Sequence, residues 1–131
     1  MDDPKSEIER ARPLQGSLRK RRVLVVDDDC AVRFSICRLL SGDFDIDTAA
    51  SAEQALALAE AKEYDVVICD YEMPGRDGLW LLRELRQRSP GAIRVLHSGS
   101  DPEGVADHVR DGLVDRFIPK PISAESISWL N

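Results

Sequence analysis

The sequence predicts an α/β fold in which five parallel strands form one doubly wound sheet. Two observations lead to this fold class. Short apolar runs at residues 23–26, 44–47, 66–69, 93–96 and 116–118 alternate with stretches whose apolar residues repeat at helical spacing. Five βα units in succession favour a parallel sheet with right-handed crossovers. The chain has 131 residues, 43% of them hydrophobic and 32% charged, which suits one globular domain.

The apolar runs differ in a way that predicts where each strand lies in the sheet. Residues 23–26 (Val-Leu-Val-Val) and 66–69 (Val-Val-Ile-Cys) are continuously apolar, as expected of central strands buried on both faces. Residues 44–47 alternate Phe, Asp, Ile and Asp, which predicts an edge strand with one solvated face. Pro119 lacks a backbone N–H and therefore favours an edge position for the fifth strand.

Apolar residues at helical spacing predict amphipathic helices over residues 32–40, 52–59 and 79–85. Ser51 and Gln54 have the spacing of a capping box at the start of the second of these helices. We expect this cap to fix where the second helix begins.

Three further signals mark helix starts. Asp29 is expected to cap the first helix, and Asp101 with Pro102 suits the N-cap and first position of a fourth helix. A short fifth helix is expected to begin near Ser123.

The charge is distributed unevenly along the chain. Residues 1–22 carry seven Lys or Arg against four Asp or Glu (+3), whereas residues 23–131 carry eleven against twenty (−9). Residues 1–21 are polar and lack an apolar period, so we expect a flexible N-terminal tail, followed by a single domain over 22–131. The acidic body argues against direct nucleic-acid binding, and the basic run Arg19–Arg22 is interpreted as a solvated lead-in to the first strand.

Several classes of protein are disfavoured by composition. No apolar run approaches the roughly 20 residues of a membrane span, and residues 1–10 lack the apolar segment of a secretory signal. The three cysteines, Cys30, Cys37 and Cys69, are odd in number and have no CxxC spacing. This pattern disfavours a disulfide framework or a zinc site and predicts a protein of the reducing cytoplasm.

Acidic residues follow two strands that we expect to be neighbours. Asp27, Asp28 and Asp29 come directly after the first strand, and Asp70 follows the third. Ligands of such sheets bind at the carboxyl ends of the strands, where strands about 4.8 Å apart would bring these carboxylates together. Converging carboxylates repel one another unless a cation neutralises them, and an oxygen-only ligand set favours Mg²⁺, or Mn²⁺ in its place. The alternative is that Asp27 and Asp28 only cap the following helix.

Two more polar residues lie at strand ends. Lys120 stands between two prolines just past the fifth strand, where the stiff backbone holds a cation near an anionic ligand. Ser98 ends the fourth strand, where its hydroxyl can donate to a phosphoryl oxygen. A solvated loop lysine and a turn hydrogen bond before Gly99 are the alternatives for these two residues.

Together these motifs resemble the receiver domain of bacterial two-component response regulators, in particular the chemotaxis regulators. The resemblance covers about residues 22–131 and depends on Val25–Asp29, Asp70–Gly78, Ser98 and Lys120–Pro121. It implies a flavodoxin-like (βα)5 fold with strand order 2-1-3-4-5. It also implies a signalling domain that catalyses only its own phosphorylation and dephosphorylation, with no separate substrate.

The resemblance implies a role for each acidic residue. Asp70 matches the phosphoacceptor, which takes a phosphoryl group from a phosphohistidine on a sensor histidine kinase or a phosphotransfer protein. Asp28 matches a direct Mg²⁺ ligand, and Asp27 an acidic neighbour that holds the metal, often through water. The backbone carbonyl of Glu72 matches a third protein ligand.

The resemblance also implies a switch. Lys120 matches the lysine that pairs with the phosphoryl group, and its bond to Pro121 is cis in the family. Ser98 matches the switch hydroxyl, and Phe117 the aromatic side chain whose rotamer follows it. The surface expected to change is formed by the fourth helix, fifth strand and fifth helix. This surface would contact an output domain, a downstream protein or a second copy of the chain.

Two other functions compete with this one. A receiver-fold interaction domain that signals without phosphorylation is disfavoured by the full set of polar residues. A Mg²⁺-dependent phosphohydrolase similar to the haloacid dehalogenases would use the Asp27-x-Asp29 spacing, but Cys30 and Ala31 lack its expected continuation. Glu72 and Gly99 depart from the usual receiver pattern, and the sequence leaves open whether the chain is a stand-alone receiver or part of a longer regulator.

Overall fold

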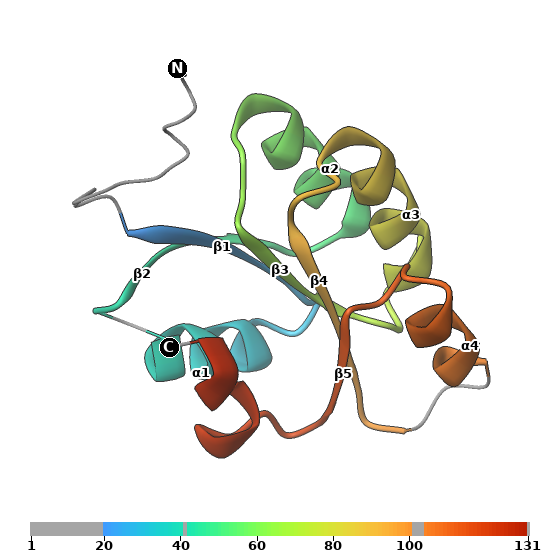
Figure 1. Ribbon diagram of the computed structural model, residues 1–131. Helices are drawn as coiled ribbons and strands as arrows, with labels where there is room; N and C mark the ends of the chain where they lie inside the picture. Colours follow the sequence, from blue (N-terminus) through green and yellow to red (C-terminus); the bar gives the residue numbers. More distant parts are fainter. Residues whose placement is uncertain (1–19, 41, 101–103, 131) are drawn as a thin grey trace.

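The computed structural model describes residues 20–40, 42–100 and 104–130, and these form one parallel sheet flanked by helices (Figure 1). The strand order is β2-β1-β3-β4-β5, which confirms the predicted fold class and strand order. The strands are β1 (Arg21–Val26), β2 (Phe44–Ala49), β3 (Val66–Asp70), β4 (Ile93–Ser98) and β5 (Arg116–Pro119). The helices are α1 (Cys30–Leu40), α2 (Ala52–Ala61), α3 (Gly78–Arg88), α4 (Val105–Arg110) and the 3-10 helix η1 (Glu125–Leu130).

Burial of the strands follows the sequence pattern. Every residue of β3 is buried, as is β1 from Val23 to Val26, and both strands have neighbours on each side. Strands β2 and β5 lie at the two edges, and both include exposed residues. The predicted central and edge positions are therefore confirmed.

The sheet separates two apolar clusters. Helices α1 and η1 cover one face, and α2, α3 and α4 cover the other (Figure 1). Successive side chains of a strand point to opposite faces, so Val23 and Val25 of β1 contact the α1 side, whereas Leu24 and Val26 contact the α3 side.

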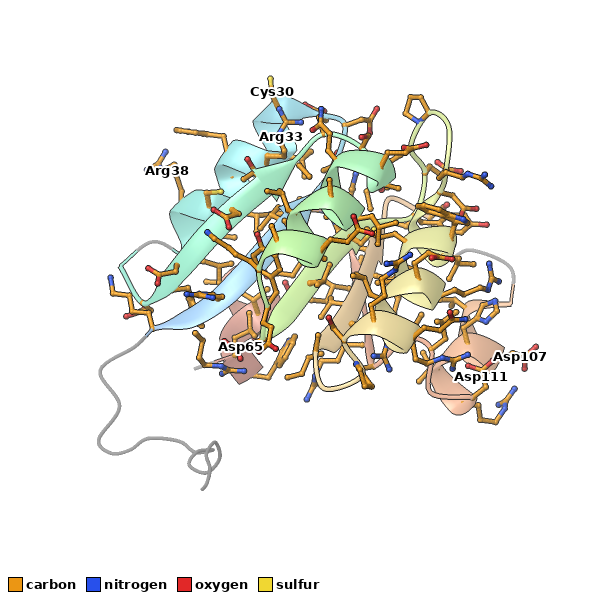
Figure 2. The ribbon with its side chains drawn as sticks, turned by 90° about the horizontal axis from the view of Figure 1, so that it is seen from above. Cys30, Arg33, Arg38, Asp65, Asp107 and Asp111 are labelled. Atoms are coloured by element: carbon orange, nitrogen blue, oxygen red, sulfur yellow. The ribbon has the colours of Figure 1, made fainter. Side chains whose placement is uncertain are left out.

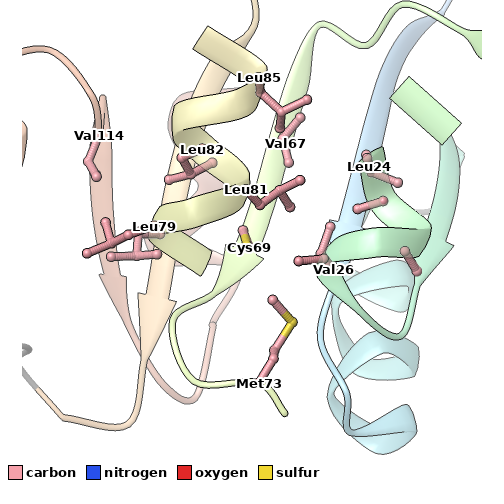
Figure 3. Packing of buried hydrophobic residues seen from close by; sticks show 14 of the residues in the cluster. Leu24, Val26, Val67, Cys69, Met73, Leu79, Leu81, Leu82, Leu85 and Val114 are labelled. Atoms are coloured by element: carbon pink, nitrogen blue, oxygen red, sulfur yellow. The ribbon is translucent and has the colours of Figure 1, made fainter. Parts of the chain in front are cut away.

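The α3 side of the core is rich in leucine. Figure 3 shows Leu79, Leu81, Leu82 and Leu85 of α3 packed against the sheet, with Cys69 near the end of β3 and Met73 beyond it in the loop that follows. Three of these leucines are predicted from the sequence, and Leu81 adds a fourth that is fully buried. This packing fixes the start of α3 against the end of β3.

Local hydrogen bonds determine the helix starts. The carboxylate of Asp29 accepts from the Ala31 N–H at 2.9 Å, and Ser51 accepts from the Gln54 N–H at 3.1 Å, so both predicted caps are present. The Gln54 side chain reaches back to the Ala50 N–H, one residue before the N-cap. Asp77, which the sequence analysis did not single out, caps α3.

The C-terminal part differs from expectation. The short fifth helix, expected to begin near Ser123, is the 3-10 helix η1 and begins at Glu125. The Ser126, Ser128 and Trp129 side chains each donate to the carbonyl three residues earlier, at 2.9 to 3.0 Å. Side chains that occupy backbone carbonyls in this way compete with the α-helical pattern.

Some predictions fall outside the part of the chain that the structure describes. The proposed start of the fourth helix at Asp101 and Pro102 is among them, and the described helix α4 begins at Val105 with Gly104 as its N-cap. Residues 1–19 of the expected tail also lie outside, while Arg21 already belongs to β1. Among the described residues, no helix is long and apolar enough to cross a membrane.

Candidate functional site

The polar residues predicted at strand ends meet at one edge of the sheet. Asp27 follows β1, Asp70 ends β3, Ser98 ends β4 and Lys120 follows β5. Because β1 and β3 are hydrogen-bonded neighbours, Asp27 and Asp70 lie side by side, and one oxygen each of Asp27, Asp28 and Asp70 falls within 4.8 Å of the others. Asp27 and Asp70 are buried, whereas Asp28 is exposed. The structure thus assembles the predicted carboxylate cluster.

Lys120 joins the two buried carboxylates. Its Nζ lies 3.0 Å from Asp27 Oδ2 and 3.3 Å from Asp70 Oδ1. Partial burial opposes the ammonium charge, but the charges and hydrogen bonds of Asp27 and Asp70 outweigh it and raise the pKa of Lys120. The peptide bond from Lys120 to Pro121 is cis, as the resemblance implied. Lys120 is therefore a cation held at the centre of the site.

The Asp70 carboxylate is destabilised as an anion. Its burial raises its pKa most, and the negative charge of Asp27 adds to the effect. Lys120 and the backbone N–H of Glu72 act in the opposite direction without fully offsetting it. A further cation at this site would relieve the remaining repulsion.

The turn after β3 is fixed by a close approach of backbone. A Cβ on Gly78 would lie 2.3 Å from the Asp70 carbonyl oxygen, so only glycine fits at this point. The Gly78 N–H donates to the Tyr71 carbonyl at 2.9 Å, and the Tyr71 N–H donates to the His97 carbonyl at 3.0 Å. These contacts hold Asp70 between β4 and the start of α3.

Arg33 supports the site from α1, and the sequence analysis missed it. Its Nη1 donates to the Asp27 backbone carbonyl at 2.7 Å, while the Asp27 N–H donates to the Ala49 carbonyl at 3.1 Å. Figure 2 shows Arg33 beside Cys30 at one end of α1, with Asp65 at the other end of the molecule. The signal that would have found it is a cation one turn into the helix that follows an acidic run.

The donor set fits a hard divalent cation. The three clustered side chains offer only carboxylate oxygens, the ligands that Mg²⁺ prefers, and Asp28 keeps the cluster open to solvent. Two of the three carboxylates share a single lysine, so negative charge remains to be neutralised. Asp27, Asp28 and Asp70 are thus the residues that would hold the metal, and the role of the Glu72 carbonyl stays a prediction.

Ser98 and Phe117 face the α3 and α4 side of the sheet. Leu96 pairs with Phe117 in the β4–β5 register, and Ser98 lies two residues further along the same face of β4. Ser98 is buried, and its Oγ accepts from the Ser100 N–H at 3.3 Å, which is the turn bond expected as its alternative role. Phe117 is half-buried against the leucine-rich cluster.

His97 lies inside the site. The ring is completely buried, and its Nε2 lies 3.5 Å from Asp27 Oδ2. Burial and the neighbouring Lys120 lower the pKa of His97 to about 3. Only the folded position of β4 shows that this ring faces a carboxylate of the cluster.

The fold and this site define a class of signalling domain, in which a parallel sheet presents buried aspartates beside a lysine. The chain belongs to the response regulator receiver domain family, which its residues 23–129 match. This result confirms the predicted resemblance and places the domain in two-component signalling.

Individual relatives agree with the family. A protein-glutamate methylesterase/protein-glutamine glutaminase of Anaeromyxobacter dehalogenans is 42% identical over 82% of the chain and 31% of its own length. The hydrogenase transcriptional regulatory protein HoxA of Cupriavidus necator is 35% identical over 79% of the chain and 22% of its own length. The chain thus spans less than a third of either curated relative.

A solved structure gives the same result. The signal receiver domain of an HD domain-containing protein from Pseudomonas fluorescens matches with a TM-score of 0.79 and 28% identity. The match covers 89% of this chain and 88% of that one. The described residues therefore correspond to nearly the whole of a known receiver domain.

Proposed function

We propose that this receiver domain accepts a phosphoryl group on Asp70 from a phosphohistidine of a sensor histidine kinase or phosphotransfer protein, with Mg²⁺ (or Mn²⁺) as cofactor. The observation that carries the proposal is the placement of Lys120 Nζ within 3.3 Å of both Asp27 and Asp70. A single cation shared by two buried carboxylates is available to a third anion that arrives at Asp70.

The transfer uses groups already in place. A carboxylate oxygen of Asp70 attacks phosphorus, the phosphorus–nitrogen bond of the phosphohistidine breaks, and the imidazole keeps the bonding electron pair. Negative charge spreads over the three remaining phosphoryl oxygens, and Lys120 is positioned to pair with one of them. Asp27, Asp28 and Asp70 would hold Mg²⁺ together with the backbone carbonyl of Glu72, and the bound ion would supply further positive charge to the phosphoryl oxygens.

The aspartyl phosphate would be read out on the surface of α4, β5 and η1. We propose that the Ser98 hydroxyl leaves its turn and donates to the phosphoryl group, and that Phe117 then occupies the space released. Arg116 of β5 lies 4.3 Å from the ring centre of Trp129 in η1, which couples the last two elements of this surface. An output domain, a downstream protein or a second copy of the chain would bind there.

The remaining expectations belong to the same proposal. The domain would act as a signalling module without a separate substrate. We also propose that the domain works in the cytoplasm, without direct contact to nucleic acid or membrane. Relatives of which the chain spans less than a third support an output unit that is covalently linked in some members.

Intact-protein mass spectrometry after incubation with acetyl phosphate tests the proposal. We expect one Mg²⁺-dependent phosphoryl adduct on the wild type, none on Asp70→Asn, and an unchanged adduct on Asp45→Asn, which removes an exposed carboxylate of β2. If the wild type gains no adduct, Mg²⁺-dependent binding of beryllofluoride separates two cases. Binding would indicate a receiver that accepts phosphate only from its kinase, and no binding would indicate an interaction domain that works without phosphorylation.

A further inference from the structure

His97 occupies a costly position. It lies opposite Asp70 in the β3–β4 register and has no exposed surface. Neither ring nitrogen has a hydrogen-bond partner among the described residues. A buried polar group without a partner destabilises a fold, and an apolar side chain would fill this strand position without that penalty. We therefore expect the ring to have a hydrogen-bond partner in another state of the site.

The group that the ring faces is Asp27. The two oxygens of this carboxylate have different surroundings, because Oδ1 accepts from the Asp29 N–H at 2.9 Å whereas Oδ2 forms the ion pair with Lys120. Within the described part of the chain, Oδ2 faces Lys120 Nζ at 3.0 Å and His97 Nε2 at 3.5 Å. The lysine is the nearer of the two and holds this oxygen in the unphosphorylated protein.

The reaction removes that lysine contact. In the proposed function, on which this inference rests, Lys120 pairs with the phosphoryl group on Asp70. Asp27 Oδ2 then loses its cation while Asp27 must stay oriented toward the metal. Carboxylates at metal sites are held in orientation by hydrogen bonds from groups behind them.

We propose that His97 is a positioning residue that donates from Nε2–H to Asp27 Oδ2 when Lys120 turns to the phosphoryl group. Nε2 and Oδ2 are 3.5 Å apart, so a small shift of the ring brings them to hydrogen-bond distance. A neutral donor suits this task, because it fixes the carboxylate without competing with the metal for its charge. A neutral imidazole carries a proton on one nitrogen and leaves the other bare.

Two substitutions separate the donor from the shape of the side chain. His97→Leu keeps a similar volume and removes the donor, whereas His97→Gln places an amide N–H near the position of Nε2. Mg²⁺ is titrated into each protein with and without beryllofluoride, and amide resonances follow binding. We expect His97→Leu to weaken Mg²⁺ binding about tenfold in the beryllofluoride state and less than threefold without it, with His97→Gln close to wild type in both.

The wild type provides a measurement that does not depend on any variant. Nitrogen chemical shifts of the His97 ring in the beryllofluoride state should show the Nε2–H tautomer with a hydrogen-bonded proton. A bare Nε2 would overturn the inference, even if His97→Leu failed to fold.

The outcomes also separate this inference from the function on which it rests. A wild type that binds beryllofluoride, with His97→Leu matching its Mg²⁺ affinity in both states, contradicts the role of His97 alone. A wild type that binds no beryllofluoride contradicts the proposed function, and the role of His97 with it.

Discussion

The strands of the sheet all begin at one end, here called the amino-terminal edge, and end at the other, the carboxyl edge. At the amino-terminal edge, two aspartates each bridge neighbouring strands. The Asp65 carboxylate accepts from the Arg22 N–H at 2.8 Å, and the Asp65 N–H donates to the Arg22 carbonyl at 2.8 Å. Asp115 makes the same pair of bonds, both of 2.8 Å, with the backbone of Arg94. Each aspartate stands directly before a strand and closes the ladder to its neighbour.

At the carboxyl edge, Asp27 and Asp70 are used in the opposite way. They lie close enough to repel each other, they share Lys120, and Asp27 Oδ2 faces a histidine whose ring nitrogens have no hydrogen-bond partner within the described part of the chain. Aspartate therefore stabilises the fold at one edge, whereas at the other edge burial and mutual repulsion disfavour its negative charge. Buried carboxylates that repel each other at strand ends indicate a binding site, whereas carboxylates that accept backbone hydrogen bonds indicate a structural role.

The largest expected effect is at the amino-terminal edge. Arg94 is 6% exposed, and its guanidinium donates to the carbonyls of Leu113, Gly112 and Ala92 at 2.9 to 3.3 Å. Arg94→Met leaves these carbonyls without their donor, so we expect about 3 kcal/mol lower free energy of unfolding in urea. Arg86→Met is the control, because Arg86 is exposed and makes one long bond of 3.4 Å, to Asp111. Equal losses in both variants would contradict the account.

Removing one aspartate bridge should have a smaller effect. Asp65→Ala removes the acceptor of the Arg22 N–H and should lower the free energy of unfolding by about 1.5 kcal/mol. The proposed phosphorylation site at the opposite edge should be unaffected, so adduct formation with acetyl phosphate should match the wild type under conditions where the variant is folded. A variant that is folded yet takes up no phosphate would link the two edges, contrary to their separation here.

Asp70→Asn should change stability in the opposite direction. It removes the charge that burial and Asp27 disfavour, so we expect a gain on the order of 1 kcal/mol in the free energy of unfolding without metal. We expect the same substitution to abolish the phosphoryl adduct. A loss of stability in the metal-free variant would show that Lys120 more than compensates the repulsion.

The pH dependence of stability should differ in sign between Asp70 and Asp47. The pKa of Asp70 is raised in the folded state, so its contribution to stability is present at low pH and is lost as pH rises through its folded pKa. The Tyr64 hydroxyl and Lys62 lower the pKa of Asp47, so its contribution is present at neutral pH and is lost as pH falls through its folded pKa. Urea titrations from pH 7 to pH 3 should show the advantage of Asp70→Asn shrinking, and the deficit of Asp47→Asn shrinking as well. An advantage of Asp70→Asn that stays constant over this range would exclude titration of Asp70 as its source.

The smallest effect concerns Glu72, an exposed carboxylate two residues after Asp70. Its charge repels an incoming phosphate through solvent, so Glu72→Asn should raise the rate of phosphorylation by acetyl phosphate about threefold. The rate of adduct formation in low salt measures this effect, and high salt should reduce it. Unchanged rates of both phosphate gain and phosphate loss would contradict a role for this charge.

The sequence predicts the features that depend on local pattern. Continuous apolar runs place β1 and β3 at the centre, and the polar residues after their ends predict the cluster of Asp27 and Asp70, because parallel strands end at one edge. The features that it misses depend on tertiary placement. Arg94 looks like an exposed strand residue until the α4–β5 turn supplies its carbonyls, and the direction of His97 follows only from its register with Asp70. The 3-10 form of η1 reflects side chains that compete for backbone carbonyls, and propensity alone does not show this.

The most direct test measures the free energy of unfolding of the wild type and Asp70→Asn, each alone and with Mg²⁺ plus beryllofluoride. If the carboxyl edge holds charge for a cation and a phosphoryl group, Asp70→Asn is the more stable protein without ligands. Adding the ligands should then raise the stability of the wild type in proportion to their binding and leave the variant nearly unchanged. A wild type that is already the more stable protein alone, together with equal ligand effects on both, would contradict the account.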